Sequence, residues 1–185
     1  MMKIMVLVLA VMMVLGVATA FAEGSTTRTT ANLTINDSRS NRTYVAYQII
    51  TGDVTGTEDS PTSPLVLSNI KWGNGVSGKT SGTALTSDEV EGLPGSTATR
   101  TEIETYLASL GTLQNPSAAA TSVTGGYQFT GLTAGWYVVK ETTEVAGEDD
   151  FTSAFIVEVV GNATATPKGS KTTSEKKVND ITTHR

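Results

Sequence analysis

Side chains able to carry out nucleophilic or metal chemistry are scarce in this chain. It contains no cysteine, which excludes disulfides, zinc–thiolate sites and thiol nucleophiles. Its single histidine, His184, lies one residue from the last. That position cannot supply the buried, oriented imidazole that a Ser-His-Asp or Cys-His mechanism or a histidine metal site requires. We therefore expect a protein that is not an enzyme and has no metal and no cofactor.

The charge pattern argues against a nucleic-acid partner. The formal net charge is -5, and the basic residues are scattered until the lysines near the C-terminus. A nucleic-acid binder usually has a basic face with aromatic side chains between the charges. We expect instead an acidic, solvated surface protein.

The first 22 residues have the layout of a secretory signal peptide. A short basic start ending at Lys3 is followed by an uncharged apolar run, residues 4–17, and then by small residues up to Ala22. Ala20 and Ala22 both fit the cleavage rule, and Ala22 is favoured because a polar stretch follows it. An uncleaved N-terminal anchor is the alternative. No second apolar segment follows, so we expect a secreted or cell-surface protein with no membrane span after cleavage.

The elements that must position any site are mostly strands. Residues 33–36 alternate between apolar and polar, and β-branched and aromatic residues fill 44–50, 64–72, 125–132, 135–141 and 151–160. The first two strands form either a hairpin or two neighbouring core strands. Apolar residues at 103, 106, 107 and 110 predict one helix over 101–110. The pattern predicts an antiparallel β-sandwich with one inserted short helix.

The composition shifts near the C-terminus. Residues 164–170 read as a linker, and residues 174–180 read as the opening of a further strand. We expect one domain over 23–165, followed by a linker and the truncated start of a second domain over 166–185. That last strand would be disordered or pair back onto the first domain.

Several short motifs, taken in order, resemble one family. Residues 45–50 (VAYQII) and 70–76 (IKWGNGV) resemble the N-terminal domain of Gram-positive fimbrial backbone pilins. Residues 129–132 (FTGL) and 135–141 (GWYVVKE) resemble a recurring run of collagen-adhesin B-type domains. The resemblance covers roughly residues 31–180. It implies an Ig-like, collagen-adhesin B-like sandwich in a pilus subunit that a sortase links to other pilin subunits at the cell wall.

The resemblance also implies a linking lysine near the end of the first domain. Its amine would attack the acyl-enzyme thioester made from another subunit. Lys168, in the run Thr-Pro-Lys-Gly, is the acceptor that we expect. Two alternatives are a plain solvated linker lysine at that position and acceptance by Lys171. The run lacks the aromatic residue and Asn that flank Pro-Lys in the fuller family pattern.

Members of the family also form intramolecular Lys–Asn isopeptide bonds beside a buried acid, and Glu141 stands where that acid would be. The first-strand lysine is missing, because residues 29–50 contain only Arg39 and Arg42 as cations. Arginine cannot be deprotonated to a nucleophile, so we expect no such bond in this domain. Glu141 would then be a rim residue or pair with a neighbouring cation. Lys176 and Lys177 resemble the corresponding lysines of a following domain.

Two further interpretations stay open. A secreted adhesin-like module would recognise a host surface protein or glycan, and Trp72, Trp136 and Tyr137 could form a sugar platform, although strand aromatics more often belong to the core. A glycosidase is disfavoured, since no paired carboxylates stand in a recognisable arrangement.

Overall fold

The computed structural model describes residues 30–95, 97–143 and 154–167. The expected signal peptide over 1–22, residues 168–170 of the expected linker, and Lys168, Lys176 and Lys177 lie outside these ranges. Residues 164 and 165, expected to belong to the linker, are instead part of the last described strand, Ala163–Ala165. None of the described helices is long and apolar enough to cross a membrane.

The described chain is mainly β, as the sequence predicts. Its strands, in chain order, are β1 (Thr30–Ile35), β2 (Tyr44–Thr55), β3 (Val66–Trp72), β4 (Ala118–Ala119), β5 (Thr121–Val123), β6 (Gly126–Thr133), β7 (Gly135–Glu141), β8 (Ala154–Val159) and β9 (Ala163–Ala165).

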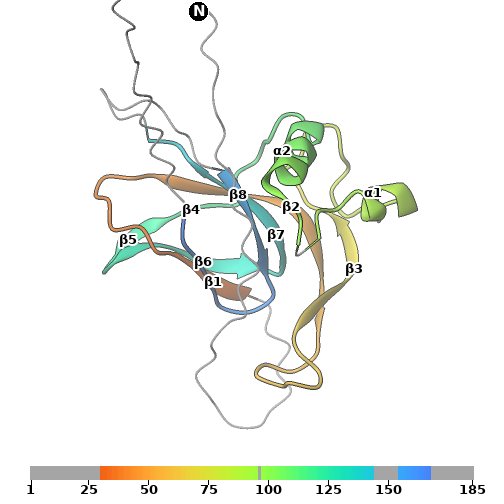
Figure 1. The fold of residues 1–185 in the computed structure, drawn as a ribbon, viewed down its shortest axis with the longest axis horizontal. Helices are drawn as coiled ribbons and strands as arrows, with labels where there is room; N and C mark the ends of the chain where they lie inside the picture. Colours follow the sequence, from red (N-terminus) through yellow and green to blue (C-terminus); the bar gives the residue numbers. More distant parts are fainter. Residues whose placement is uncertain (1–29, 96, 144–153, 168–185) are drawn as a thin grey trace, which may run out of the picture.

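The strands form two sheets packed face to face (Figure 1). One sheet has the order β5-β6-β1-β9, and the other has the order β3-β2-β7-β8 with β4 also pairing with β2. All pairings are antiparallel except the one between β1 and β9. The first two strands lie in different sheets, so they are not a hairpin, and residues 36–43 cross between the sheets.

Alternating apolar residues form the core between the sheets. Leu33 and Ile35 of β1 and Tyr137 and Val139 of β7 are at most 1% exposed, as the period of two along a strand requires. Gly126 is the first residue of β6, and its backbone lies close to that of β1. A side chain cannot be accommodated there, because a Cβ would collide with the carbonyl oxygen of Ile35. The hydrophobic effect of this burial is the main force that holds the sheets together.

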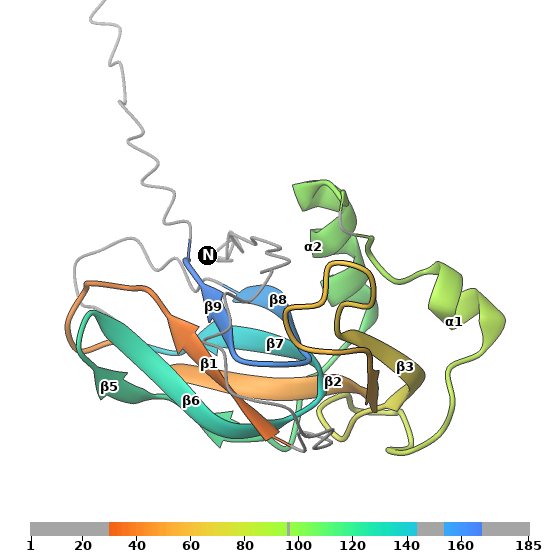
Figure 2. The ribbon, with the colours of Figure 1, turned by 90° about the horizontal axis from the view of Figure 1, so that it is seen from below.

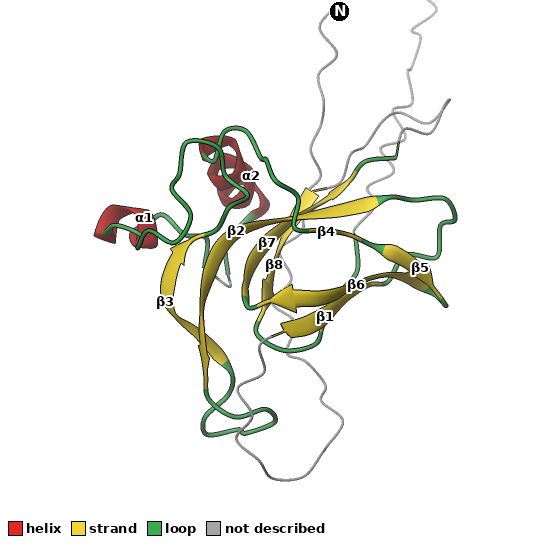
Figure 3. Ribbon diagram, turned by 180° about the vertical axis from the view of Figure 1, so that it is seen from behind, coloured by secondary structure: helices red, strands yellow, loops and turns green. Residues whose placement is uncertain are grey.

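Two helices, rather than the single one predicted, lie between β3 and β4 (Figure 3). The predicted helix is α2 (Arg100–Ser109), and the missed one is α1 (Ser87–Glu91). Both begin with a capping box, in which Thr86 bonds Glu89 and Thr99 bonds Glu102. The helix α1 has no buried residue, so no apolar period marks it in the sequence.

The helix α2 extends the core onto the outer face of the five-stranded sheet. Val138 and Ile156 are buried on the face of β7 and β8 opposite Tyr137, and they belong to the same apolar cluster as Ile103 and Leu110, within and just after α2. Apolar side chains are therefore buried on both faces of this sheet.

The parallel pairing of β1 with β9 sets where the chain enters and leaves the described fold. Leu33 pairs with Ala163 and Ile35 with Ala165, so both strands run the same way. The N-terminal end of β1 and the C-terminal end of β9 therefore lie at opposite ends of the sandwich (Figure 2).

Candidate functional site

A cluster of charged side chains lies at the end of the sandwich where β7 ends. We call Asp37, Arg39, Arg42, Tyr44 and Glu141 the Glu141 cluster. Glu141 is the last residue of β7 and pairs with Tyr44, the first residue of β2. The three other members belong to the connection between β1 and β2, which the change of sheet brings over this end.

Glu141 is buried, with 2% of its surface exposed, and it pairs with two arginines. Its Oε1 lies 3.1 Å from a terminal nitrogen of Arg42, and its Oε2 lies 3.1 Å from one of Arg39. Arg42 is nearly enclosed while Arg39 is part-exposed, with side-chain exposures of 11% and 41%. The sequence left two alternatives for Glu141, a position at the rim or pairing with a neighbouring cation. The structure shows the pairing, and the rim position is wrong because the side chain is buried.

Asp37 completes the cluster by binding Arg39 with both carboxylate oxygens. The Arg39 Nε donates to Oδ1 at 2.9 Å, and its terminal nitrogen donates to Oδ2 at 2.8 Å. The Tyr44 hydroxyl donates to Oδ2 at 2.6 Å. Burial alone would raise the pKa of Asp37, but the hydrogen bonds from Arg39 and Tyr44 outweigh it, so the pKa lies below its usual value.

Tyr127, from β6 of the opposite sheet, holds the β1–β2 connection (residues 36–43) in place. Its hydroxyl donates to the carbonyl oxygen of Arg39 at 2.7 Å and accepts from the backbone N–H of Arg42 at 2.9 Å. Its ring packs on Tyr44 with centroids 5.3 Å apart. The two arginines are thus held by their backbone as well as by their charges.

The chain leaves the described fold beside this cluster. The backbone N–H of Asn36 donates to the carbonyl oxygen of Ala165 at 2.8 Å, so the end of β9 lies next to Asn36 and hence to the start of the crossing connection. Lys168 follows Ala165 by three residues. Lys168, Lys176 and Lys177 lie outside the described residues, and the structure gives none of them a position.

The surroundings of Glu141 differ from those an amine nucleophile would need. Its neighbour Lys140 points to the opposite face of β7, because successive strand residues alternate. Among the described residues, the ion pairs of Glu141 are with Arg39 and Arg42, and arginine cannot lose a proton to become a nucleophile. The arrangement is suited to holding the β1–β2 connection against the end of β7.

The aromatic residues considered for sugar binding belong mostly to the core. Trp72 is 5% and Tyr137 1% exposed, whereas Trp136 is half-buried. The Trp72 indole N–H donates to Glu89 at 3.2 Å, and Lys79 lies 4.6 Å above the Trp72 ring. A platform of three exposed rings is therefore excluded.

Sequence reasoning missed Asp37 and Tyr44 as members of the cluster and read residues 36–41 as turn alone. A signal for Asp37 was present, since Asp and Asn side chains in turns often accept a hydrogen bond from the backbone two residues on. Here the Arg39 backbone N–H donates to Asp37 Oδ1 at 3.0 Å.

Comparison with protein-family models, with curated proteins and with solved structures finds no match for this chain. The functional argument therefore rests on the residues and their geometry.

Proposed function

We propose that this chain is a structural subunit of a sortase-assembled Gram-positive pilus, as the N-terminal domain of a pilin with an Ig-like, collagen-adhesin B-like sandwich. It would be exported, displayed at the cell surface and joined to other pilin subunits, and it would contribute to adhesion. Its role is not enzymatic.

The observation that carries the proposal is the parallel pairing of β1 with β9. In such a domain the polypeptide enters at one end and leaves at the opposite end. This arrangement suits subunits that are joined end to end. The link that a sortase makes needs an exposed amine close to such an end. Lys168 comes three residues after β9 and directly after Pro167.

The Glu141 cluster supports the same reading. It fixes the β1–β2 connection at the end where the chain leaves, through ion pairs that include the one between Arg39 and Glu141, which are 102 positions apart. A rigid end is useful to a subunit that must bear load at its junction. No step of a chemical reaction is assigned to Glu141.

The experiment is a sortase reaction on the mature chain beginning at Glu23, with a pilin-type sortase and a sorting-signal peptide. We expect an adduct on Lys168, located by peptide mass mapping. Lys168→Arg keeps the charge but removes the nucleophile, so it should abolish the adduct. Lys171→Arg is the matched control and should react normally.

Modification of Lys171 alone would move the link to that residue. Reaction at neither lysine would contradict the pilin proposal and favour the second candidate, a secreted adhesin-like module that binds a host protein or glycan. That candidate has less support, because Trp72 and Tyr137 are buried.

A further inference from the structure

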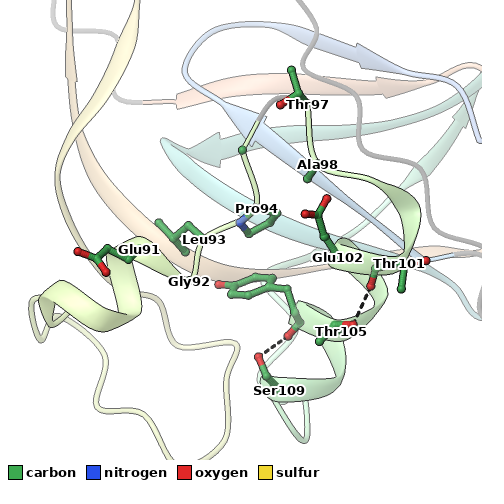
Figure 4. Close-up of a pocket in the computed structure, with 12 residues that line it drawn as sticks. Glu91, Gly92, Leu93, Pro94, Thr97, Ala98, Thr101, Glu102, Thr105 and Ser109 are labelled. Atoms are coloured by element: carbon green, nitrogen blue, oxygen red, sulfur yellow. Dashed lines mark hydrogen bonds between the residues drawn. The ribbon is translucent and has the colours of Figure 1, made fainter.

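An open pocket of about 540 Å³ lies between α1 and α2, away from the Glu141 cluster (Figure 4). The loop that joins the helices forms one wall, with Leu93, Pro94 and Ala98, and α2 forms the other. Two acidic residues belong to the lining, Glu91 at the end of α1 and Glu102 in the first turn of α2. No lysine, arginine or histidine is among the residues that line it.

The two carboxylates are available to a cation. Neither Glu91 nor Glu102 forms an ion pair with another described residue. Glu102 is held ionised, because hydrogen bonds from the backbone and hydroxyl of Thr99 lower its pKa. Glu91 ends α1, where the helix dipole disfavours a negative charge. A positive group with an aliphatic stem fits this lining, since the stem can lie on Leu93 and Pro94.

The chain itself carries a matching segment. Residues 30–167 contain fifteen acidic and six basic residues, whereas residues 168–185 contain five basic and two acidic residues. The two parts therefore have formal charges of opposite sign. The densest positive charge is the adjacent pair Lys176 and Lys177.

We propose that the pocket between α1 and α2 binds the Lys176–Lys177 pair of the same chain. Lys176 follows Pro167 by nine residues, which span up to about 30 Å when extended, about the diameter of a small domain. Figure 2 shows the end of β9 and α2 on the same side of the molecule. A short tether also gives an effective concentration on the order of millimolar, so the chain's own lysines compete well against those of other copies.

This docking goes beyond the pilin proposal and does not depend on it. Lys168 would stay in the connecting stretch between β9 and the bound pair, and the lysines in the pocket would be shielded from reaction. Because the contact is electrostatic and lies at the surface, it should weaken as salt is added.

A spin label tests the proposal in the mature chain. The absence of native cysteine lets Ser174→Cys carry a single nitroxide. We expect paramagnetic broadening of the amide signals of Gly92, Gly95 and Ala98. Broadening should be lost in Lys176→Gln/Lys177→Gln, in Glu91→Gln, and in about 1 M salt, where the Debye length falls to about 3 Å. Asp88→Asn, on the same helix but outside the pocket lining, is the matched control and should keep it.

Three outcomes would overturn the proposal. The pocket amides could be no more broadened than the rest of the surface. Asp88→Asn could abolish the effect as fully as Glu91→Gln, which would reduce it to general attraction between opposite charges. Broadening could also be transferred to unlabelled chains mixed with labelled ones, which would make a second copy the occupant. Dispersed amide spectra of each variant establish that it is folded.

Discussion

At the scale of single residues, Glu141 shows how a buried charge is tolerated. Its two oxygens each face an arginine at 3.1 Å, so neither partner is left alone in a low-dielectric interior. Such pairs contribute little net stability over apolar replacements, yet removing one partner is costly. The cluster is therefore sensitive to any change that alters the charge on one side only.

We expect Glu141→Gln to lower the free energy of unfolding by about 3 kcal/mol, because Arg42 would stay buried beside an uncharged amide. Urea denaturation measures the change. Glu104→Gln, which breaks the exposed Arg100–Glu104 pair, is the control and should cost about 0.5 kcal/mol or less. Equal losses in the two variants would contradict the burial argument.

Two tyrosine hydroxyls give a matched comparison. The Tyr44 hydroxyl donates to a carboxylate, whereas the buried Tyr106 hydroxyl has no hydrogen-bond partner among the described residues. We expect Tyr44→Phe to cost about 2 kcal/mol and Tyr106→Phe to be neutral or stabilise by about 1 kcal/mol. Thermal and urea unfolding both report the difference, and a destabilised Tyr106→Phe would mean that its hydroxyl is satisfied.

At the scale of elements, the short helix α1 depends on polar anchors rather than on burial. Glu89 accepts from Lys79 at 2.5 Å, from the Thr86 backbone at 2.8 Å and from the Trp72 indole at 3.2 Å. These hydrogen bonds lower the pKa of Glu89 to about 2, and the one from Lys79 has the largest effect. The same carboxylate completes the capping box of α1.

A depressed carboxyl pKa gives stability above the unfolded pKa that is lost as the pH falls toward the folded one. For Glu89 this window runs from 4.5 down to about 2. We expect its carboxyl carbon to titrate near 2 by NMR, and Lys79→Met to raise that midpoint. An unchanged midpoint in the variant would show that Lys79 is not the main cause. Lys71→Met, on β3, is the control.

The sequence supports prediction of elements better than of their assembly. Residues 135–141 and 44–50 are visible as strands through β-branched and aromatic content, and 101–110 as a helix through its period. The helix α1 and the strands β4 and β9 are too short to show a period. Whether β1 and β2 form a hairpin depends on contacts of the crossing connection with Tyr127 and Glu141, which lie far away in sequence.

The candidate site could be predicted only in part, because its contacts also join residues that lie far apart in sequence. Glu141 could be singled out by resemblance, and Arg39 and Arg42 could be excluded as nucleophiles by their chemistry. Their ion pairs could not be foreseen, because these join residues about a hundred positions apart and depend on which sheet each strand enters.

At the scale of the whole molecule, the described domain is a sandwich with entry and exit at opposite ends, a strongly acidic composition and a basic segment beyond it. The pilin proposal uses the first property, and the docking proposal uses the charge difference. Either proposal can be contradicted without affecting the other, because a sortase adduct on Lys168 and paramagnetic broadening at the pocket are independent measurements.

The parallel alignment of β1 with β9 has a mechanical consequence. When the two ends of this domain are pulled apart, the strands slide along each other, and the hydrogen bonds between them are sheared together instead of opening one at a time. We expect single-molecule pulling through the two ends to need a higher force than pulling between Ile50 and Trp72, the paired residues farthest from the loop that joins β2 to β3, where the hairpin would unzip one hydrogen bond at a time. The parallel alignment of the two terminal strands would make the domain resist tension applied through its two ends.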